Sequence, residues 1–297
     1  MDWKTEYMGL TLSSPLLLSS GEASNGFEKI SAAIQAGAGA VVTPSIRLAP
    51  MVQPQKDIDV LPCGLGLLNA QGHSSIPWEE WVKEILPAAK KAGYTVIAKT
   101  GYTLEDVEAL VPVLTSAGAA GIEIIAPTSD LMARMICAAK QRTHLPVSAK
   151  VSGRWPDLEE VAWNCVDAGA DGLTVMDTIG PALRLDTRTG EPSLDGENRH
   201  GKGFGWLSGT AILPVTLAYV AKLRRSNPGL SIAGVGGVTS GGAAMQMLLA
   251  GATVVGVQSA VIAEGPGTIS RILRELRTEL EPWGDIDRAR GYAQRFI

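Results

Sequence analysis

The sequence predicts an α/β fold in which eight parallel strands close into a barrel and helices cover its outside. Short apolar runs alternate with longer amphipathic runs along the whole chain, and this alternation is typical of a parallel sheet wrapped by helices. The tripeptide Ala-Gly-Ala stands just before four of the apolar runs, where glycine can end a helix before the chain enters a strand. We therefore expect a (β/α)8 TIM barrel, formed as a single domain by residues 1–297.

The apolar runs are the expected strands, and the amphipathic runs are the expected helices. The strands are predicted at 16–20, 40–43, 95–99, 121–125, 146–150, 172–176, 231–235 and 254–258. The helices are predicted at 27–36, 78–92, 104–116, 158–168, 211–223 and 242–250.

Two long insertions interrupt the regular alternation, one at 44–94 after the second strand and one at 178–209 after the sixth. Each follows the carboxyl end of a strand, and this is the face of such a barrel that carries the active site. Long loops within a compact domain are usually functional. Both insertions are therefore expected at the rim of a functional site.

Small residues end both of the last two predicted strands. Gly236 and Gly237 follow the seventh, Gly256 lies near the end of the eighth, and Ser259 follows it. Backbone N–H groups can converge there on an anion, as in the phosphate-binding site of many α/β barrels. The pattern predicts a phosphorylated cofactor or substrate, and by itself it allows phosphosugar isomerases, indole-pathway barrels, aldolases and flavoproteins.

Composition favours small-molecule chemistry in the cytoplasm. The net charge of −4 gives no basic face for nucleic acid or an anionic membrane. Cys63, Cys137 and Cys165 form no Cys-x-x-Cys pair, so neither a metal site nor a disulfide framework is predicted. The first residues have no signal-peptide pattern, and no apolar run is long enough to span a membrane. We expect a soluble protein.

Five segments, in order along nearly the whole chain, together resemble the dihydroorotate dehydrogenase family of FMN barrels. They read PLLLSSG at 15–21, GLLN at 66–69, PVSAK at 146–150, GWLSG at 205–209 and AGVGGVTS at 233–240. The resemblance implies an FMN-dependent oxidoreductase of pyrimidine metabolism or a related route. In such an enzyme a hydride passes between the flavin and a carbon–carbon bond next to a carbonyl, as in a dihydropyrimidine.

The resemblance also implies which residues bind the cofactor and the substrate. The cofactor-binding residues would be Ser19, Ser20, Gly21, Thr43, Lys99, Lys150, Asp177, Thr178, Ser208, Gly209, Gly236, Gly237, Gln258 and Ser259. The substrate-binding residues would be Asn69, Thr128 and Thr178. An ammonium at Lys150 would stabilise negative charge on the reduced flavin.

The sequence departs from the family pattern where protons are transferred. Ala126 stands in place of the catalytic cysteine or serine, and Pro44 stands in place of a lysine. The candidate catalytic residues are Lys150, Glu123, Asp177 and Ser129. Burial could raise the pKa of either carboxyl group enough for acid–base work, or the carboxylates could pair with a lysine.

Further roles stay open at this stage. His73 and Tyr102 on rim loops are further candidate proton donors, and Lys99 could partly replace the cation missing at Pro44. Trp206 stands where the family usually has glycine and could cap the pocket or simply pack.

Three alternatives stay open. The first is an authentic dihydroorotate dehydrogenase in which Ser129 or another group replaces the usual base. The second is a flavin-free phosphosugar lyase or isomerase that uses Lys99 or Lys150, and the third is a catalytically silent flavin-binding paralogue. Because no iron–sulfur motif is present, electrons would pass to a soluble partner or to a separate electron-transfer subunit. The resemblance implies a homodimer.

Overall fold

A closed barrel of eight parallel strands forms the centre of the molecule in the computed structural model, which describes residues 3–49, 56–70, 73–155, 157–198 and 200–297. Its strands are β3 (Leu16–Leu18), β4 (Ala40–Val42), β7 (Val96–Gly101), β8 (Gly121–Ile125), β9 (Val147–Ser152), β10 (Gly172–Asp177), β15 (Ile232–Val235) and β16 (Val254–Val257). They neighbour one another in this order, and β16 pairs with β3 to close the ring. The predicted fold class and all eight predicted strands are confirmed.

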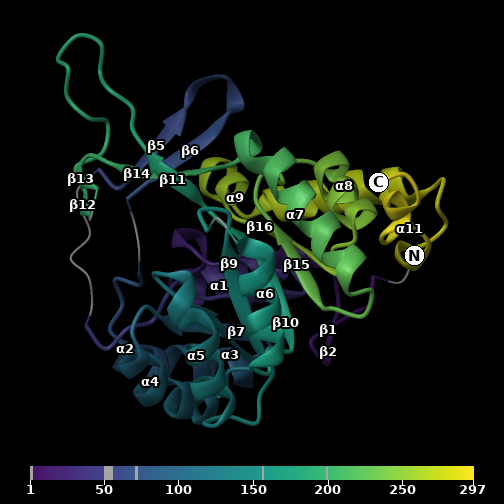
Figure 1. Ribbon diagram of the computed structural model, residues 1–297, viewed down its shortest axis with the longest axis horizontal. Helices are drawn as coiled ribbons and strands as arrows, with labels where there is room; N and C mark the ends of the chain where they lie inside the picture. Colours follow the sequence, from purple (N-terminus) through teal and green to yellow (C-terminus); the bar gives the residue numbers. More distant parts are fainter. Residues whose placement is uncertain (1–2, 50–55, 71–72, 156, 199) are drawn as a thin grey trace.

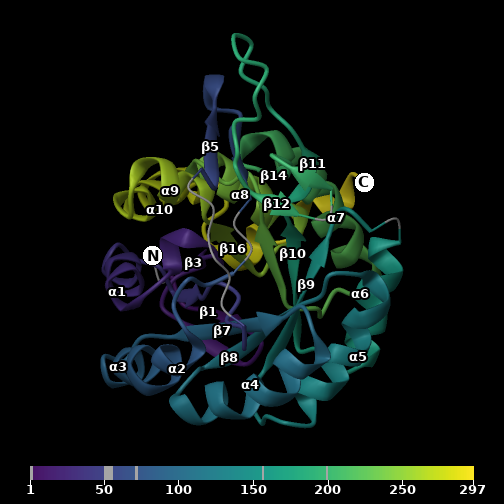
Figure 2. The ribbon, with the colours of Figure 1, turned by 90° about the vertical axis from the view of Figure 1, so that its left-hand side faces the viewer.

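Helices surround the barrel (Figures 1 and 2). Those that match the predicted ranges are α1 (Phe27–Gln35), the run α2 (Trp78–Glu80), η3 (Trp81–Ile85) and α3 (Leu86–Lys91), α4 (Leu104–Ala117), α6 (Leu158–Asp167), α7 (Leu213–Ser226) and α8 (Gly241–Ala250). Further helices, which the sequence pattern does not predict, are α5 (Ser129–Lys140), α9 (Ser259–Glu264), α10 (Gly267–Leu280) and α11 (Ile286–Ala289). Gly118 and Gly251 end α4 and α8 in the left-handed conformation, as the Ala-Gly-Ala pattern predicts.

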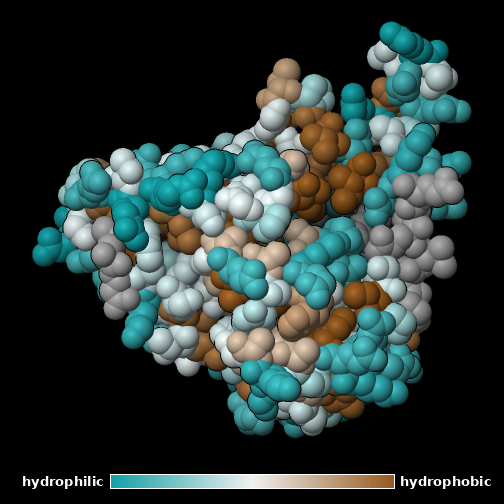
Figure 3. Space-filling model, turned by 180° about the vertical axis from the view of Figure 1, so that it is seen from behind, coloured by the Kyte–Doolittle hydropathy of each residue, from teal (hydrophilic) through white to brown (hydrophobic). Residues whose placement is uncertain are grey.

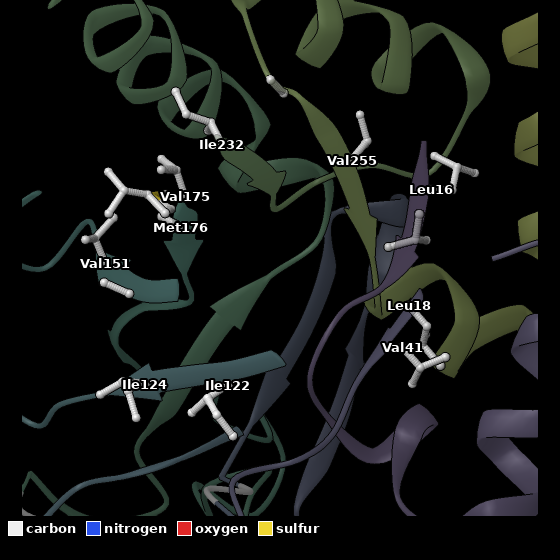
Figure 4. Close-up of a cluster of buried hydrophobic side chains, with 14 of the residues drawn as sticks. Leu16, Leu18, Val41, Ile122, Ile124, Val151, Val175, Met176, Ile232 and Val255 are labelled. Atoms are coloured by element: carbon white, nitrogen blue, oxygen red, sulfur yellow. The ribbon is translucent and has the colours of Figure 1, made fainter. Parts of the chain in front are cut away.

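The barrel core has two parts because strand side chains alternate between the inside and the outside. Ile122 and Ile124 of β8 lie in the outer core, between the strands and the helices (Figure 4). The inner core holds Leu17 and Ile97, together with residues of an N-terminal hairpin formed by β1 (Thr5–Tyr7) and β2 (Leu10–Leu12). The hairpin therefore helps to fill the barrel interior.

The two insertions meet in a second sheet. It contains β5 (Ile58–Leu61), β6 (Gly66–Asn69), β11 (Ile179–Ala182) and β14 (Gly205–Ser208), in the order β11-β14-β6-β5. A short pair, β12 (Glu197–Asn198) and β13 (Gly201–Lys202), lies in the second insertion. The predicted loops 44–94 and 178–209 include residues 50–55, 71–72 and 199, which lie outside the described residues.

This second sheet projects from one end of the barrel, as both ribbon views show. Its two insertions are held close together, since a Cβ at Gly66 would lie 1.9 Å from the backbone oxygen of Ser208. Exposed apolar side chains lie on and next to it, at Val60, Leu65, Leu183 and Leu185. Figure 3 shows apolar surface gathered beside this projection. Within the described residues, no helix is both long and apolar enough to cross a membrane.

Candidate active site

A polar cavity lies at the carboxyl ends of the barrel strands and is bounded by residues of the second sheet. Every predicted cofactor-binding residue except Thr43 lines it, and so does Asn69. The predicted residues at the cavity are Ser19, Ser20, Gly21, Asn69, Lys99, Lys150, Asp177, Thr178, Ser208, Gly209, Gly236, Gly237, Gln258 and Ser259. The fold thus brings together segments from both ends of the sequence and from both insertions.

Two lysine side chains meet at one serine hydroxyl on the cavity wall. Lys99 Nζ donates a hydrogen bond to Ser20 Oγ at 2.9 Å, and Lys150 Nζ donates to the same oxygen at 3.2 Å. Lys99 belongs to β7 and Lys150 to β9, and each is only 5% exposed. The site therefore concentrates positive charge in a poorly hydrated place, where it favours a negatively charged group.

Asp177 at the end of β10 balances part of this charge, because its Oδ1 lies 3.5 Å from Lys150 Nζ. Burial alone would raise the pKa of the Asp177 carboxyl group. The nearby charges of Lys150, Lys99 and Arg154 outweigh that effect, so the pKa falls below its usual value. Of the two possibilities left open by the sequence, Asp177 therefore follows the second: it pairs with a lysine, and its pKa is lowered, not raised.

Burial raises the pKa of a carboxyl group such as Asp177, but it lowers the pKa of the Lys99 ammonium. Burial, followed by the charge of Lys150, lowers the pKa of the Lys99 ammonium from 10.5 to about 8, although Glu123 and Asp177 partly oppose the fall. Lys99 is held in place by Thr43, whose Oγ1 accepts a hydrogen bond from the Lys99 backbone N–H at 2.9 Å. Thr43 is fully buried and positions the lysine without lining the cavity.

Gly236 and Gly237 form another part of the wall, with φ of +127° and +83°. Glycine is needed here, because a Cβ on Gly237 would lie 2.5 Å from Leu213 Cβ. Within the part of the chain that the structure describes, neither backbone N–H group donates to another backbone group. These groups are suited to bind an anion such as a phosphate.

Gln258 holds the turn after β3. With its amide oriented to satisfy both ends, it donates to the Ser19 oxygen at 2.7 Å and accepts from the N–H groups of Glu22 and Ala23, each at 3.1 Å. A Cβ at Gly21 would lie 2.3 Å from this amide. The small residues after β3 therefore fit closely against Gln258.

Besides Thr43, three predicted site residues do not line the cavity. Thr128 precedes α5 and is exposed, and Ser129 is the first residue of that helix. Glu123 lies inside the barrel and is 2% exposed, and its Oε2 accepts a hydrogen bond from Thr174 Oγ1 at 2.6 Å. No contact in the described residues supports the roles predicted for these three side chains.

Two aromatic rings on the rim do line the cavity, His73 and Tyr102. Their ring centroids are 4.2 Å apart in an edge-to-face arrangement. Arg47 Nη1 lies 3.3 Å from His73 Nε2, and because a guanidinium can only donate, this contact favours a neutral imidazole. Asp106 in turn fixes Arg47 through an ion pair of 2.9 Å.

Sequence reasoning missed several other cavity residues. Glu22, Ser45, Glu197 and Asn198 lie in turns and insertions, where no spacing pattern marked them. Trp206, which was predicted to cap the pocket or simply to pack, lines the cavity, and the guanidinium of Arg154 lies 5.8 Å from its ring centroid.

The barrel and its cavity together define an α/β-barrel enzyme with its site at the carboxyl ends of the strands. The sequence pattern of the dihydroorotate dehydrogenase family matches residues 3–280 of this chain. The catalytic subunit of dihydroorotate dehydrogenase B (NAD(+)) from Geobacter sulfurreducens is 30% identical over 302 residues, which cover 96% of this chain and 95% of the relative.

Two further relatives agree with this. The corresponding catalytic subunit from Methanothermobacter thermautotrophicus is 28% identical, with 98% of each chain covered. The putative dihydroorotate dehydrogenase A (fumarate) of Solibacter usitatus is 31% identical, with 94% of each chain covered. This chain therefore belongs to the dihydroorotate dehydrogenase family, and the predicted oxidoreductase of that type, acting on CH–CH groups, is confirmed.

Proposed function

We propose that this chain binds FMN in the cavity and transfers a hydride between the flavin and a carbon–carbon bond next to a carbonyl group. The substrate would be a dihydropyrimidine or a related amide or enone, and the whole chain would act as one FMN-binding domain. The observation that carries the proposal is the meeting of Lys99 and Lys150 at Ser20 within a cavity lined by nearly all predicted cofactor-binding residues.

The donor groups of the cavity fit FMN at two points. Gly236, Gly237 and Ser259 would bind the phosphate through backbone N–H groups and a hydroxyl. Lys150, which Asp177 holds in place, would face the part of the ring that gains negative charge. Bound FMN would supply the two-electron chemistry that side chains lack, and the second sheet would limit the access of water.

Substrate would be held by residues of the second sheet and of the rim. Asn69 Nδ2 donates to the backbone oxygen of Trp206 at 3.3 Å, so its amide is oriented at the cavity wall. Thr178 would assist from the end of β10. Because Pro44 lines the cavity in place of a lysine, the substrate would differ in charge or shape from that of typical family members.

The proton that accompanies the hydride needs a carrier other than Ala126. Lys150 and Asp177 line the cavity and remain candidates for catalytic roles, as do His73 and Tyr102. Ser129 and Glu123 would need a rearrangement to reach the cavity, because neither lines it.

We also propose a separate electron-transfer subunit, a homodimer and a cytoplasmic location. The names of two relatives describe catalytic subunits, which supports a partner that carries electrons onward. The exposed apolar residues Val60, Leu65, Leu183 and Leu185 support a dimer formed near the second sheet.

The test is the absorption spectrum of the purified protein, with the released chromophore identified by mass. The expected result is a yellow protein with one FMN per chain, bleached anaerobically by a dihydropyrimidine or reoxidised by an enone. Lys150→Gln should slow that bleaching at least tenfold, while the matched surface variant Lys140→Gln should not. A colourless protein that does not bind added FMN would overturn the proposal and favour a sugar-phosphate substrate.

Bleaching by dihydroorotate and not by dihydrouracil would instead identify an authentic dihydroorotate dehydrogenase with a replaced base. Retained FMN with no reduction by any donor would identify a silent paralogue.

A further inference from the structure

Among the described residues, no ion pair is formed by Lys99, whereas Lys150 pairs with Asp177 and the cavity carboxylate Glu22 pairs with Lys29. Charged groups reach Lys99 from three neighbouring strands, which contribute Glu123 of β8, Lys150 of β9 and Asp177 of β10. Of the two carboxylates, Asp177 pairs with Lys150 and Glu123 is held by Thr174 inside the barrel. The other neighbour of β7 in the barrel is β4, and the residues that follow β4, Thr43 and Pro44, are uncharged.

The hydrogen bonds at Ser20 make the Lys99 ammonium easier to deprotonate. Two ammonium groups that donate to one oxygen bring like charges together, which disfavours protonation of one of them. Lys150 has Asp177 as its ion-pair partner. When Lys99 is a neutral amine, the Ser20 hydroxyl can accept a hydrogen bond from Lys150 and donate its own proton to the lone pair of Lys99 Nζ, so the contact at Ser20 can form in both protonation states of Lys99.

The acid–base balance of Lys99 agrees with this arrangement. Burial and the charge of Lys150 place the pKa of its ammonium at about 8. Near that pH a small change in the charge of the cavity decides whether the group carries a proton. A negative charge that arrives close to Nζ favours the ammonium form.

We propose that Lys99 takes up a proton when negative charge arrives in the cavity, and that it thereby adds a second proton to the two-electron reduction of the bound cofactor. The inference rests on the proposed function, because the charge is that which a hydride adds to FMN. The hydride delivers two electrons and one proton to the flavin. The second proton comes from water, converts the Lys99 amine into an ammonium, and returns to water on reoxidation.

The test is a spectroelectrochemical titration of the FMN-loaded protein between pH 6.5 and 9.5. One additional proton per two electrons steepens the fall of the midpoint potential by about 30 mV per pH unit. We expect this steeper slope in the wild type above about pH 8, where the oxidised protein holds a neutral Lys99. Below that pH the lysine is already charged, so the slope should be shallower.

Two variants of Lys99 sharpen the result. Lys99→Gln cannot take up a proton, and Lys99→Arg is always charged, so neither should show the added slope. The arginine variant should have the higher potential of the two at pH 9. The control Lys140→Gln, which changes a half-exposed lysine paired with Asp171 on the outside of the barrel, should keep the slope of the wild type.

Parallel lines for the wild type and Lys99→Gln over the whole pH range would overturn this inference and leave the proposed function standing. If the wild type bound no FMN, both would be overturned together. Because the slope of the wild type is itself diagnostic, the test holds even where a variant fails to fold.

Discussion

Replacing Lys99 by methionine should stabilise the protein near pH 7. Methionine keeps an unbranched chain of similar length and removes an ammonium that is 5% exposed. The fall of the Lys99 pKa from 10.5 to about 8 corresponds, at about 1.36 kcal/mol per unit, to a cost of about 3 kcal/mol for the buried charge. The lost hydrogen bond to Ser20 offsets about 1 kcal/mol of this. We therefore expect Lys99→Met to raise the free energy of unfolding by about 2 kcal/mol.

The sign of the pH dependence follows from the same shift. The folded-state pKa of Lys99 lies below the unfolded value, so between pH 8 and 10.5 the unfolded chain binds more protons. The wild type therefore gains stability as pH rises through this window, and the advantage of the variant should shrink from pH 7 to pH 9.5. Urea denaturation of flavin-free protein at both values measures this.

The control for this experiment is Lys140→Met, which removes an exposed ion pair with Asp171 and should change stability by less than about 1 kcal/mol at either pH. A lower stability of Lys99→Met than of the wild type at pH 7 would contradict the cost assigned to the buried ammonium. An equal difference between the two proteins at both pH values would contradict the lowered pKa of Lys99.

Two further substitutions test the surroundings of the cavity. Asp106→Ala removes a carboxylate that is 2% exposed and paired with Arg47, and it should lower the free energy of unfolding, measured in urea, by about 3 kcal/mol. Its control is Glu108→Ala, which removes an exposed carboxylate paired with Arg142 and should lower the free energy of unfolding by less than about 1 kcal/mol. Gly237→Ala should weaken FMN binding at least tenfold in a fluorescence titration, because its φ is +83° and the added Cβ would lie 2.5 Å from Leu213. Gly267→Ala, where nothing lies within 4 Å of the added Cβ, should bind FMN as the wild type does.

Much of the barrel could be predicted from the sequence because its signals are local. The apolar runs mark buried strands, and a glycine such as Gly118 or Gly251 ends the helix before the next strand. Lys99 and Lys150 could be placed at the cavity because each lies near the carboxyl end of a predicted strand, where barrel sites are found. Their shared contact with Ser20 involves three separate strand ends, and no sequence spacing reports that contact.

The remaining features depend on strand pairing between distant parts of the sequence and on how deep a side chain lies within the barrel. The β6 and β14 strands pair through contacts such as Asn69 with Trp206, far apart in the sequence, so each looked like an irregular loop by itself. The position of Glu123 depends on depth within the barrel. The alternation of side chains along β8 predicts that Glu123 points into the barrel, but it does not tell how far the carboxylate lies below the cavity. The two possibilities for Asp177 could not be separated from the sequence for a related reason, because no spacing reports that Lys150 lies near enough to outweigh burial.

The pairing of β6 with β14 also bears on how this family can diversify. Cavity-lining residues come from two insertions, yet hydrogen bonds between the insertions join them into one sheet. A change in the length of one insertion would shift the register of the other, so neither can be exchanged alone. A chimera that takes a new specificity from a relative would have to inherit both segments from the same parent, while the barrel beneath could stay unchanged.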